Sequence, residues 1–186
     1  MFAPKLYQHY AVTLGNLFRH HTGLEHNFKN SIFPAISFNC GPATVSLEHN
    51  DDGNLSNGLC SLTSLGLYDY TIGGHLILVH LGLIVQFPPG STVLIPSALV
   101  DHGNTPIQPG ENRMSITQYA AGGLFRWVAY GFKSAKDLMK TKAGKKKKAL
   151  IDKEDGVRWK EGLAMFSKVD ELQADVQAVF NHSARE

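Results

Sequence analysis

The chain has 186 residues, of which 43% are hydrophobic and 18% charged, enough for one domain with a short appendage. The net charge of +2 hides an asymmetry: residues 1–131 contain 5 Lys/Arg against 7 acids, and residues 132–186 contain 13 against 9. There is no run of eighteen apolar residues, no signal-peptide pattern at the start and only two cysteines. We therefore expect no membrane span and no disulfide framework, and a reducing intracellular compartment.

The first 120 residues predict one helix followed by strands. Residues 4–20 carry an apolar stripe at helical spacing, formed by Leu6, Tyr10, Leu14 and Leu17. Short β-like runs separated by turn-forming clusters follow, at 31–38, 59–67, 75–87, 92–100 and 113–119. Many short strands arranged in this way predict a sandwich, jelly roll or barrel, so the fold class is mainly β with flanking helices.

The C-terminal part differs in character, because residues 133–148 contain eight lysines and one acid. We interpret 132–157 as a Lys-rich linker or extended helix, and 158–186 as a C-terminal segment with an amphipathic helix over 158–181. Residues 1–131 then form the main domain with its N-terminal helix. Three roles stay open for the lysines: contact with DNA phosphates, nuclear localisation, or a solvated linker.

Three polar side chains in the β region have the chemistry of a metal site. His49 and Asp51 are two residues apart, so on a strand both point to the same face. His102 follows at the end of the strand-like run 93–100. Two histidines and one carboxylate on a β scaffold form the ligand set of a non-haem Fe(II) facial triad with open coordination positions.

Arg113 adds a candidate anion clamp eleven residues beyond His102. On a strand, Arg113 and Ser115 share a face. A guanidinium holds a carboxylate through two parallel hydrogen bonds, and a nearby hydroxyl adds another. An enzyme that uses 2-oxoglutarate needs such a clamp for the distal carboxylate. The alternative is that Arg113 pairs with a surface acid such as Glu111.

These residues belong to a longer series of motifs. They are Phe-Pro-Ala-Ile-Ser-Phe-Asn (33–39), His49-x-Asp51 with Asn54, Gly-Gly-His-Leu (73–76), Phe-Pro-Pro-Gly-Ser-Thr (87–92), Ile-Pro-Ser-Ala (95–98), His-Gly-Asn (102–104), Arg113-x-Ser115-x-x-Gln118-Tyr119 and Gly-Gly-Leu-Phe-Arg-Trp-Val (122–128). With them, residues 33–132 resemble the TET/JBP-like family of 2-oxoglutarate/Fe(II) dioxygenases, specifically its fungal, transposon-associated branch.

The resemblance implies a double-stranded β-helix (jelly-roll) core. It implies Fe(II) held by His49, Asp51 and His102, and 2-oxoglutarate held by Arg113 with Ser115 assisting. It also implies that the protein uses O2 to oxidise the methyl group of a base in DNA, or in RNA, with succinate as co-product. The usual family base is 5-methylcytosine, and N6-methyladenine is a variation; a duplex base would have to be flipped out. A nuclear location follows as an expectation.

Four other residues are candidates for supporting roles. Asn39 either reaches the 2-oxoglutarate or bonds to the backbone beside Gly41-Pro42. Asn54, Asp69 and Tyr119 are candidate substrate contacts, although an aromatic residue on a jelly-roll strand usually belongs to the core.

Two other functions compete with a base oxygenase. The chain could be a jelly-roll binding module without iron chemistry, or it could apply the same chemistry to a protein side chain or small molecule. The complete set of His49, Asp51, His102 and Arg113 argues against the inactive module, because a degenerate module has little reason to keep all four.

Overall fold

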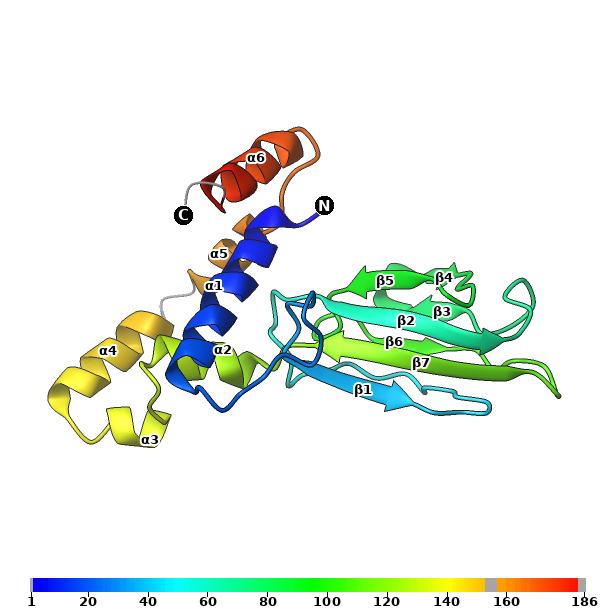
Figure 1. Ribbon diagram of the computed structural model, residues 1–186, viewed down its shortest axis with the longest axis horizontal. Helices are drawn as coiled ribbons and strands as arrows, with labels where there is room; N and C mark the ends of the chain where they lie inside the picture. Colours follow the sequence, from blue (N-terminus) through cyan, green and yellow to red (C-terminus); the bar gives the residue numbers. More distant parts are fainter. Residues whose placement is uncertain (1, 153–156, 184–186) are drawn as a thin grey trace. The chain divides into compact units, whose positions relative to one another are not determined.

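The computed structural model describes residues 2–152 and 157–183. Two compact units make up the chain (Figure 1). Residues 33–122 form the first, called here the β unit, and the described residues of 1–32 and 123–186 form the second, the helical unit. Over the described ranges, no helix combines the length and the apolar character needed to cross a membrane.

Two antiparallel sheets build the β unit. The larger sheet has the order β1-β7-β2-β5 and consists of β1 (Ala35–Asn39), β2 (Cys60–Leu67), β5 (Thr92–Ile95) and β7 (Asn112–Tyr119). The smaller sheet has the order β4-β3-β6 and consists of β3 (Leu76–Leu78), β4 (Leu83–Val85) and β6 (His102–Asn104). A short 3-10 helix, Val79–Leu81, lies between β3 and β4.

Residues 44–49 continue the smaller sheet beyond β6 without forming a regular strand. The Asn104 amide donates to the Ser46 carbonyl over 3.0 Å, and His49 and His102 exchange two backbone hydrogen bonds of 3.0 and 2.8 Å. Counting this segment, the chain passes between the larger and the smaller sheet at every strand except from β3 to β4, which are neighbours in the smaller sheet. That is the strand order of a double-stranded β-helix, so the predicted mainly β, jelly-roll core with flanking helices is confirmed.

Period-2 alternation decides what the larger sheet presents to the interior. The core cluster consists of Cys60, Leu76, Leu78, Phe87 and Ile95. On β7 the positions 113, 115, 117 and 119 share one face and line a cavity next to that cluster, as do 37 and 39 on β1. The same alternation therefore supplies apolar residues to the core and polar residues to the cavity.

The predicted runs differ from the strands at three places. The run 75–87 divides into β3 and β4, because the chain reverses at Gly82, whose φ of 61° is the left-handed conformation that glycine favours. The run 92–100 ends at Ile95, since Pro96 has no amide to donate. Strand β6, His-Gly-Asn, was not predicted, because its residues have low intrinsic strand propensity and it forms through long-range pairing with β3.

The helical unit is built on α1 (Pro4–His20), which confirms the predicted N-terminal helix. The Tyr10 ring lies 5.0 Å from Phe125 of α2 (Gly122–Ala129), and Tyr7 lies 5.5 Å from Phe180 of α6 (Leu172–Ser183). The helical unit therefore combines residues from both ends of the chain, because α1 packs with α2 and α6.

The Lys-rich stretch and the C-terminal segment both contain more helices than predicted. Residues 132–152 contain α3 (Ala135–Leu138) and α4 (Lys142–Asp152), while residues 153–156 lie outside the described residues. The helix expected over 158–181 is interrupted, giving α5 (Arg158–Ala164) and α6. Val169 lies between the two helices and is 95% exposed. It therefore contributes no packing that would continue the helix.

Gly66 in β2 is a position where only glycine fits. Its φ is +119°, and a Cβ there would collide with the Asn112 carbonyl oxygen. We expect Gly66→Ala to lower the free energy of unfolding, measured by denaturant titration, by at least twice as much as Gly90→Ala. Gly90 also has a positive φ, of +85°, but open space around it, so its substitution costs only the backbone term of about 1–2 kcal/mol. Equal losses for both variants would contradict the close approach at Gly66.

Candidate metal and anion site between the two sheets

A cavity of about 380 Å³ lies between the two sheets of the β unit. The larger sheet lines it with Asn39 of β1 and with Arg113, Ser115 and Tyr119 of β7. The opposite wall contains His49, Asp51 and residues of β6. The cavity thus places polar side chains of the larger sheet opposite His49, Asp51 and His102, which neither sheet could do alone.

His49, Asp51 and His102 form a group that could hold a metal ion. One ligand atom from each residue lies within 4.8 Å of the others. The prediction that His49 and Asp51 share a strand face is wrong, because His49 makes an isolated bridge to His102 and Asp51 lies in the turn that follows. The turn places the carboxylate beside the histidines: the Asn54 amide donates to the Asp51 carbonyl over 2.9 Å.

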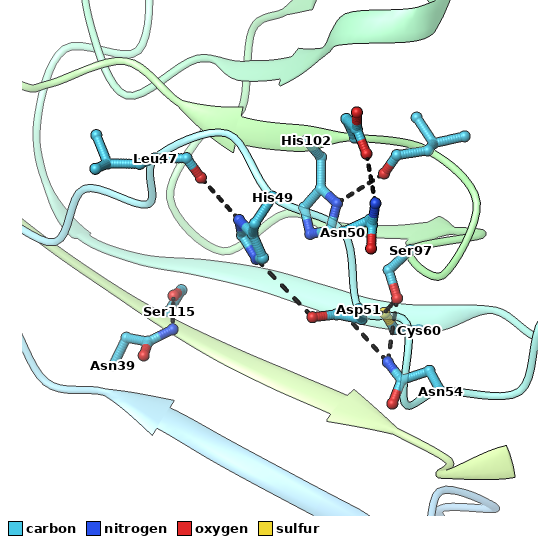
Figure 2. A network of polar contacts seen from close by, with 12 residues as sticks. Asn39, Leu47, His49, Asn50, Asp51, Asn54, Cys60, Ser97, His102 and Ser115 are labelled. Atoms are coloured by element: carbon cyan, nitrogen blue, oxygen red, sulfur yellow. Dashed lines mark hydrogen bonds and ion pairs between the residues drawn. The ribbon is translucent and has the colours of Figure 1, made fainter.

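Both histidines are held with one ring nitrogen directed at a backbone carbonyl. His49 Nδ1 lies 2.7 Å from the Leu47 carbonyl oxygen, and His102 Nδ1 lies 2.9 Å from that of Val100 (Figure 2). A carbonyl only accepts hydrogen bonds, so Nδ1 is the donor in each pair, and in the neutral ring Nε2 then has the lone pair that a metal ion needs. Backbone partners of this kind orient metal-binding imidazoles in proteins.

The two carboxylate oxygens of Asp51 have different surroundings. Oδ1 lies 3.9 Å from His49 Nε2, and Oδ2 accepts a hydrogen bond of 3.2 Å from the Asn54 side chain (Figure 2). The Cys60 thiol lies 4.0 Å from Oδ2. Burial raises the pKa of this thiol to about 11, against a lowering by its hydrogen bond with Ser97, so the thiol is protonated at neutral pH.

Arg113 places a positive charge in the cavity with only 4% of its surface exposed. Nη1 donates to the Thr44 carbonyl over 3.2 Å, while Nε is buried without a hydrogen-bond partner. The alternative pairing with Glu111 is excluded, since that carboxylate accepts backbone amides of Asp69 and Gln108, each over 2.7 Å. A buried guanidinium with an unused donor fits an anionic ligand, because an uncompensated buried charge is costly.

Ser115 and Asn39 lie beside Arg113 and contact each other. They are paired across β7 and β1, and Asn39 Nδ2 donates to Ser115 Oγ over 3.0 Å. The Ser115 oxygen is thereby used as an acceptor, which leaves its O–H free to donate to a ligand. The side chain of Asn39 therefore contacts the part of the cavity near Arg113 through Ser115. It is bonded to a side chain there, and not only to the backbone as in the alternative.

The three candidate substrate contacts have different surroundings. Tyr119 lines the cavity and also packs against the core cluster. Asp69 lies outside the cavity lining, in a turn where its carboxylate accepts hydrogen bonds from Thr71, which lower its pKa. Asn54 is also outside the lining, and its amide nitrogen contacts Asp51 and Ser97. Sequence reasoning included Ser97 in the Ile-Pro-Ser-Ala motif but assigned it no role, because its contact with Asn54 spans 43 residues.

The β unit is thus a double-stranded β-helix whose interior carries a 2-His-1-carboxylate set together with a buried arginine, the donor set typical of non-haem Fe(II) sites.

Comparisons with known proteins give low similarity. No protein-family model and no curated protein matches the chain. Among solved structures, NgTET1 in complex with 5mC DNA is 20% identical with a TM-score of 0.44, over 57% of this chain and 42% of that one. The viral collagen prolyl hydroxylase of Paramecium bursaria Chlorella virus-1, in its 2OG complex, is 13% identical with a TM-score of 0.31, over 59% of this chain and 70% of that one. The chain spans less than half the length of NgTET1.

Proposed function

We propose that this protein is an Fe(II)- and 2-oxoglutarate-dependent dioxygenase that oxidises the methyl group of a base in DNA, 5-methylcytosine or N6-methyladenine. The observation that carries the proposal is the presence, in one cavity, of three metal-ligating atoms within 4.8 Å and a buried guanidinium with an unused donor. When bound, Fe(II) with 2-oxoglutarate and O2 supplies oxidation of a C–H bond, with succinate and CO2 as co-products.

Five residues of the cavity have a defined part in this proposal. His49 and His102 present Nε2 lone pairs to the metal, and Asp51 presents one carboxylate oxygen. Arg113 and Ser115 bind the distal carboxylate of 2-oxoglutarate by charge and by an O–H donor. Leu76 and Phe87 of the apolar core cluster line the cavity, and apolar walls strengthen electrostatic contacts of this kind.

The DNA substrate is supported by the family resemblance and by the charge of the helical unit. The β unit contains one basic residue, Arg113, which is buried, and six carboxylates. The exposed Lys142, Lys145 and Lys146 lie on α4 at spacings of three and four, so they share one face of that helix. Phosphates would therefore be bound by the helical unit, since the β unit has no exposed cation.

Removing those three lysines tests the phosphate contacts. We expect Lys142→Gln/Lys145→Gln/Lys146→Gln to weaken DNA binding and to reduce the slope of log affinity against log salt by about two to three units. Fluorescence anisotropy at several salt concentrations measures this slope. The matched control is Lys140→Gln/Lys168→Gln, whose lysines already pair with Asp137 and Glu171. An unchanged slope in the triple variant would assign the lysines to localisation or to solvation of the helix.

The reaction itself is tested by mass spectrometry of nucleosides after incubation with methylated duplex DNA, Fe(II), ascorbate and 2-oxoglutarate. An oxidised or lost methyl group that depends on 2-oxoglutarate would support the proposal and identify the base. Succinate without a change in any base would keep the oxygenase chemistry and move the substrate to a protein side chain or a small molecule. A protein or small-molecule substrate is the second candidate function, because the β unit that contains the cavity is acidic and offers no exposed lysine or arginine to DNA phosphates. Neither product would favour a binding module.

A further inference from the structure

Two side chains, Asn54 and Cys60, approach one oxygen of the Asp51 carboxylate, and both also contact Ser97 (Figure 2). Asn54 Nδ2 lies 3.2 Å from Asp51 Oδ2 and 3.2 Å from Ser97 Oγ, so the two hydrogens of one amide group serve two acceptors. Cys60 Sγ lies 2.7 Å from the same Ser97 oxygen. The amide of Asn54 thus has no hydrogen left for a further partner.

Cys60 and Ser97 are buried at one end of the larger sheet, Cys60 in β2 and Ser97 in the turn after β5. Both are 2% exposed. Cys60 begins β2 and is paired with Ile95 of β5, and Ser97 follows two residues later. The Ser97 carbonyl also accepts the backbone amide of Asp51 over 2.9 Å. Ser97 therefore fixes Asp51 twice, through the main chain directly and through the side chain of Asn54.

His49 is anchored to the other sheet by its backbone hydrogen bonds with His102 of β6. The two ligands of the His49-x-Asp51 motif are consequently fixed to different sheets. Contacts with the end of the larger sheet orient the Asp51 carboxylate, and the smaller sheet holds His49. The hydrogen bond from Asn54 holds Oδ2 on the side of the larger sheet, and Oδ1 is the oxygen that lies toward His49, 3.9 Å from its Nε2.

We propose that Asn54 is a positioning residue: through its amide, held by Ser97, it directs a single oxygen of Asp51 toward the metal. This inference rests on the proposed function and deepens its metal site. It replaces the expectation that Asn54 contacts the substrate, because both of its amide hydrogens are used inside the protein and Asn54 is outside the cavity lining.

Metal affinity without turnover is the test. We expect Asn54→Ala to raise the dissociation constant of Mn(II), titrated by electron paramagnetic resonance in the absence of 2-oxoglutarate, by about 10-fold or more. We expect the visible spectrum of the Co(II) protein to change as well, which a purely structural effect on stability would not produce. The matched control is Asn50→Ala: this neighbouring asparagine donates to Asp101 over 2.8 Å, a carboxylate outside the metal group. Its Mn(II) affinity and Co(II) spectrum should stay at the wild-type values.

Two further variants distinguish a loss of positioning from misfolding of Asn54→Ala. Ser97→Ala keeps Asn54 but removes its second acceptor, so we expect a loss of Mn(II) affinity in the same direction and smaller. In an Asp51→Ala background, Asn54→Ala should have no added effect, since its action passes through that carboxylate.

The proposal is overturned if Asn54→Ala and Ser97→Ala bind Mn(II) within twofold of the wild type. A raised KM for DNA with unchanged metal affinity would return Asn54 to the substrate. A wild-type chain that binds no Mn(II) would instead overturn the proposed function.

Discussion

The variant His102→Ala is expected to lose metal-dependent turnover of 2-oxoglutarate by at least about 100-fold while the chain stays folded. His102 is one of three ligand side chains, and an octahedral ion held by only two is bound weakly and in the wrong geometry. The hydrogen bonds that fix β6 to residues 44–49 are made by its backbone and by the Asn104 side chain, so they survive the substitution. Succinate formation measures turnover, and circular dichroism with thermal unfolding measures the fold.

His80→Ala is the control for this experiment. His80 is an exposed histidine of the same unit whose ring lies 3.5 Å from the Asp101 carboxylate, next to His102 in the sequence. We expect normal turnover from it. If His102→Ala also turns over normally, the metal assignment is wrong. If both variants fail, the effect comes from the surroundings of Asp101 rather than from the metal.

Arg113→Met is expected to change ligand binding and stability in opposite directions. The apparent KM for 2-oxoglutarate should rise at least about 30-fold, because the ligand carboxylate loses a buried charged partner. The thermal midpoint without ligand should stay the same or increase, since a buried cation with an unpaired Nε is replaced by an apolar side chain of similar length. The KM of Arg113→Lys for 2-oxoglutarate should lie between those of the wild type and Arg113→Met, because lysine keeps the charge and loses the planar fork of the guanidinium.

Ligand-induced stabilisation measures both effects together. In the wild type with Mn(II), 2-oxoglutarate should raise the thermal midpoint by mass action, and in Arg113→Met this increase should disappear. Arg126→Met, on α2 of the helical unit, is the control and should keep the increase. A KM for 2-oxoglutarate that is unaffected in Arg113→Met would show that the anion binds elsewhere.

The elements that the sequence predicts well are those whose signal is local. The stripe of Leu6, Tyr10, Leu14 and Leu17 predicts α1 with its bounds, because helical periodicity is a property of neighbouring residues. The run 113–119 predicts β7 to within one residue for the same reason. The prediction of a single helix over 158–181 is wrong, because the apolar spacing continues through the segment between α5 and α6. Whether the chain stays helical there depends on packing, which the spacing does not show.

The candidate site divides in the same way. The side chains His49, Asp51, His102 and Arg113 stand out by residue type, so the sequence names them without any knowledge of the fold. How they meet depends on pairing between distant segments. The expected shared strand face of His49 and Asp51 does not exist, and a bridge across 53 residues, from His49 to His102, brings the ligands together instead.

By itself, the sequence determined the β class of residues 33–122, the N-terminal helix, and the identity of the side chains with metal-binding and anion-binding chemistry. Only the tertiary structure decided that β6 exists, that Arg113 is buried away from Glu111, and that Asn54 contacts Asp51. The physical reason is the sequence distance over which each effect acts. Propensity, periodicity and residue chemistry act over a few neighbouring residues. Backbone pairing and the burial of a charge depend on segments that are far apart in the chain and meet only in the folded β unit.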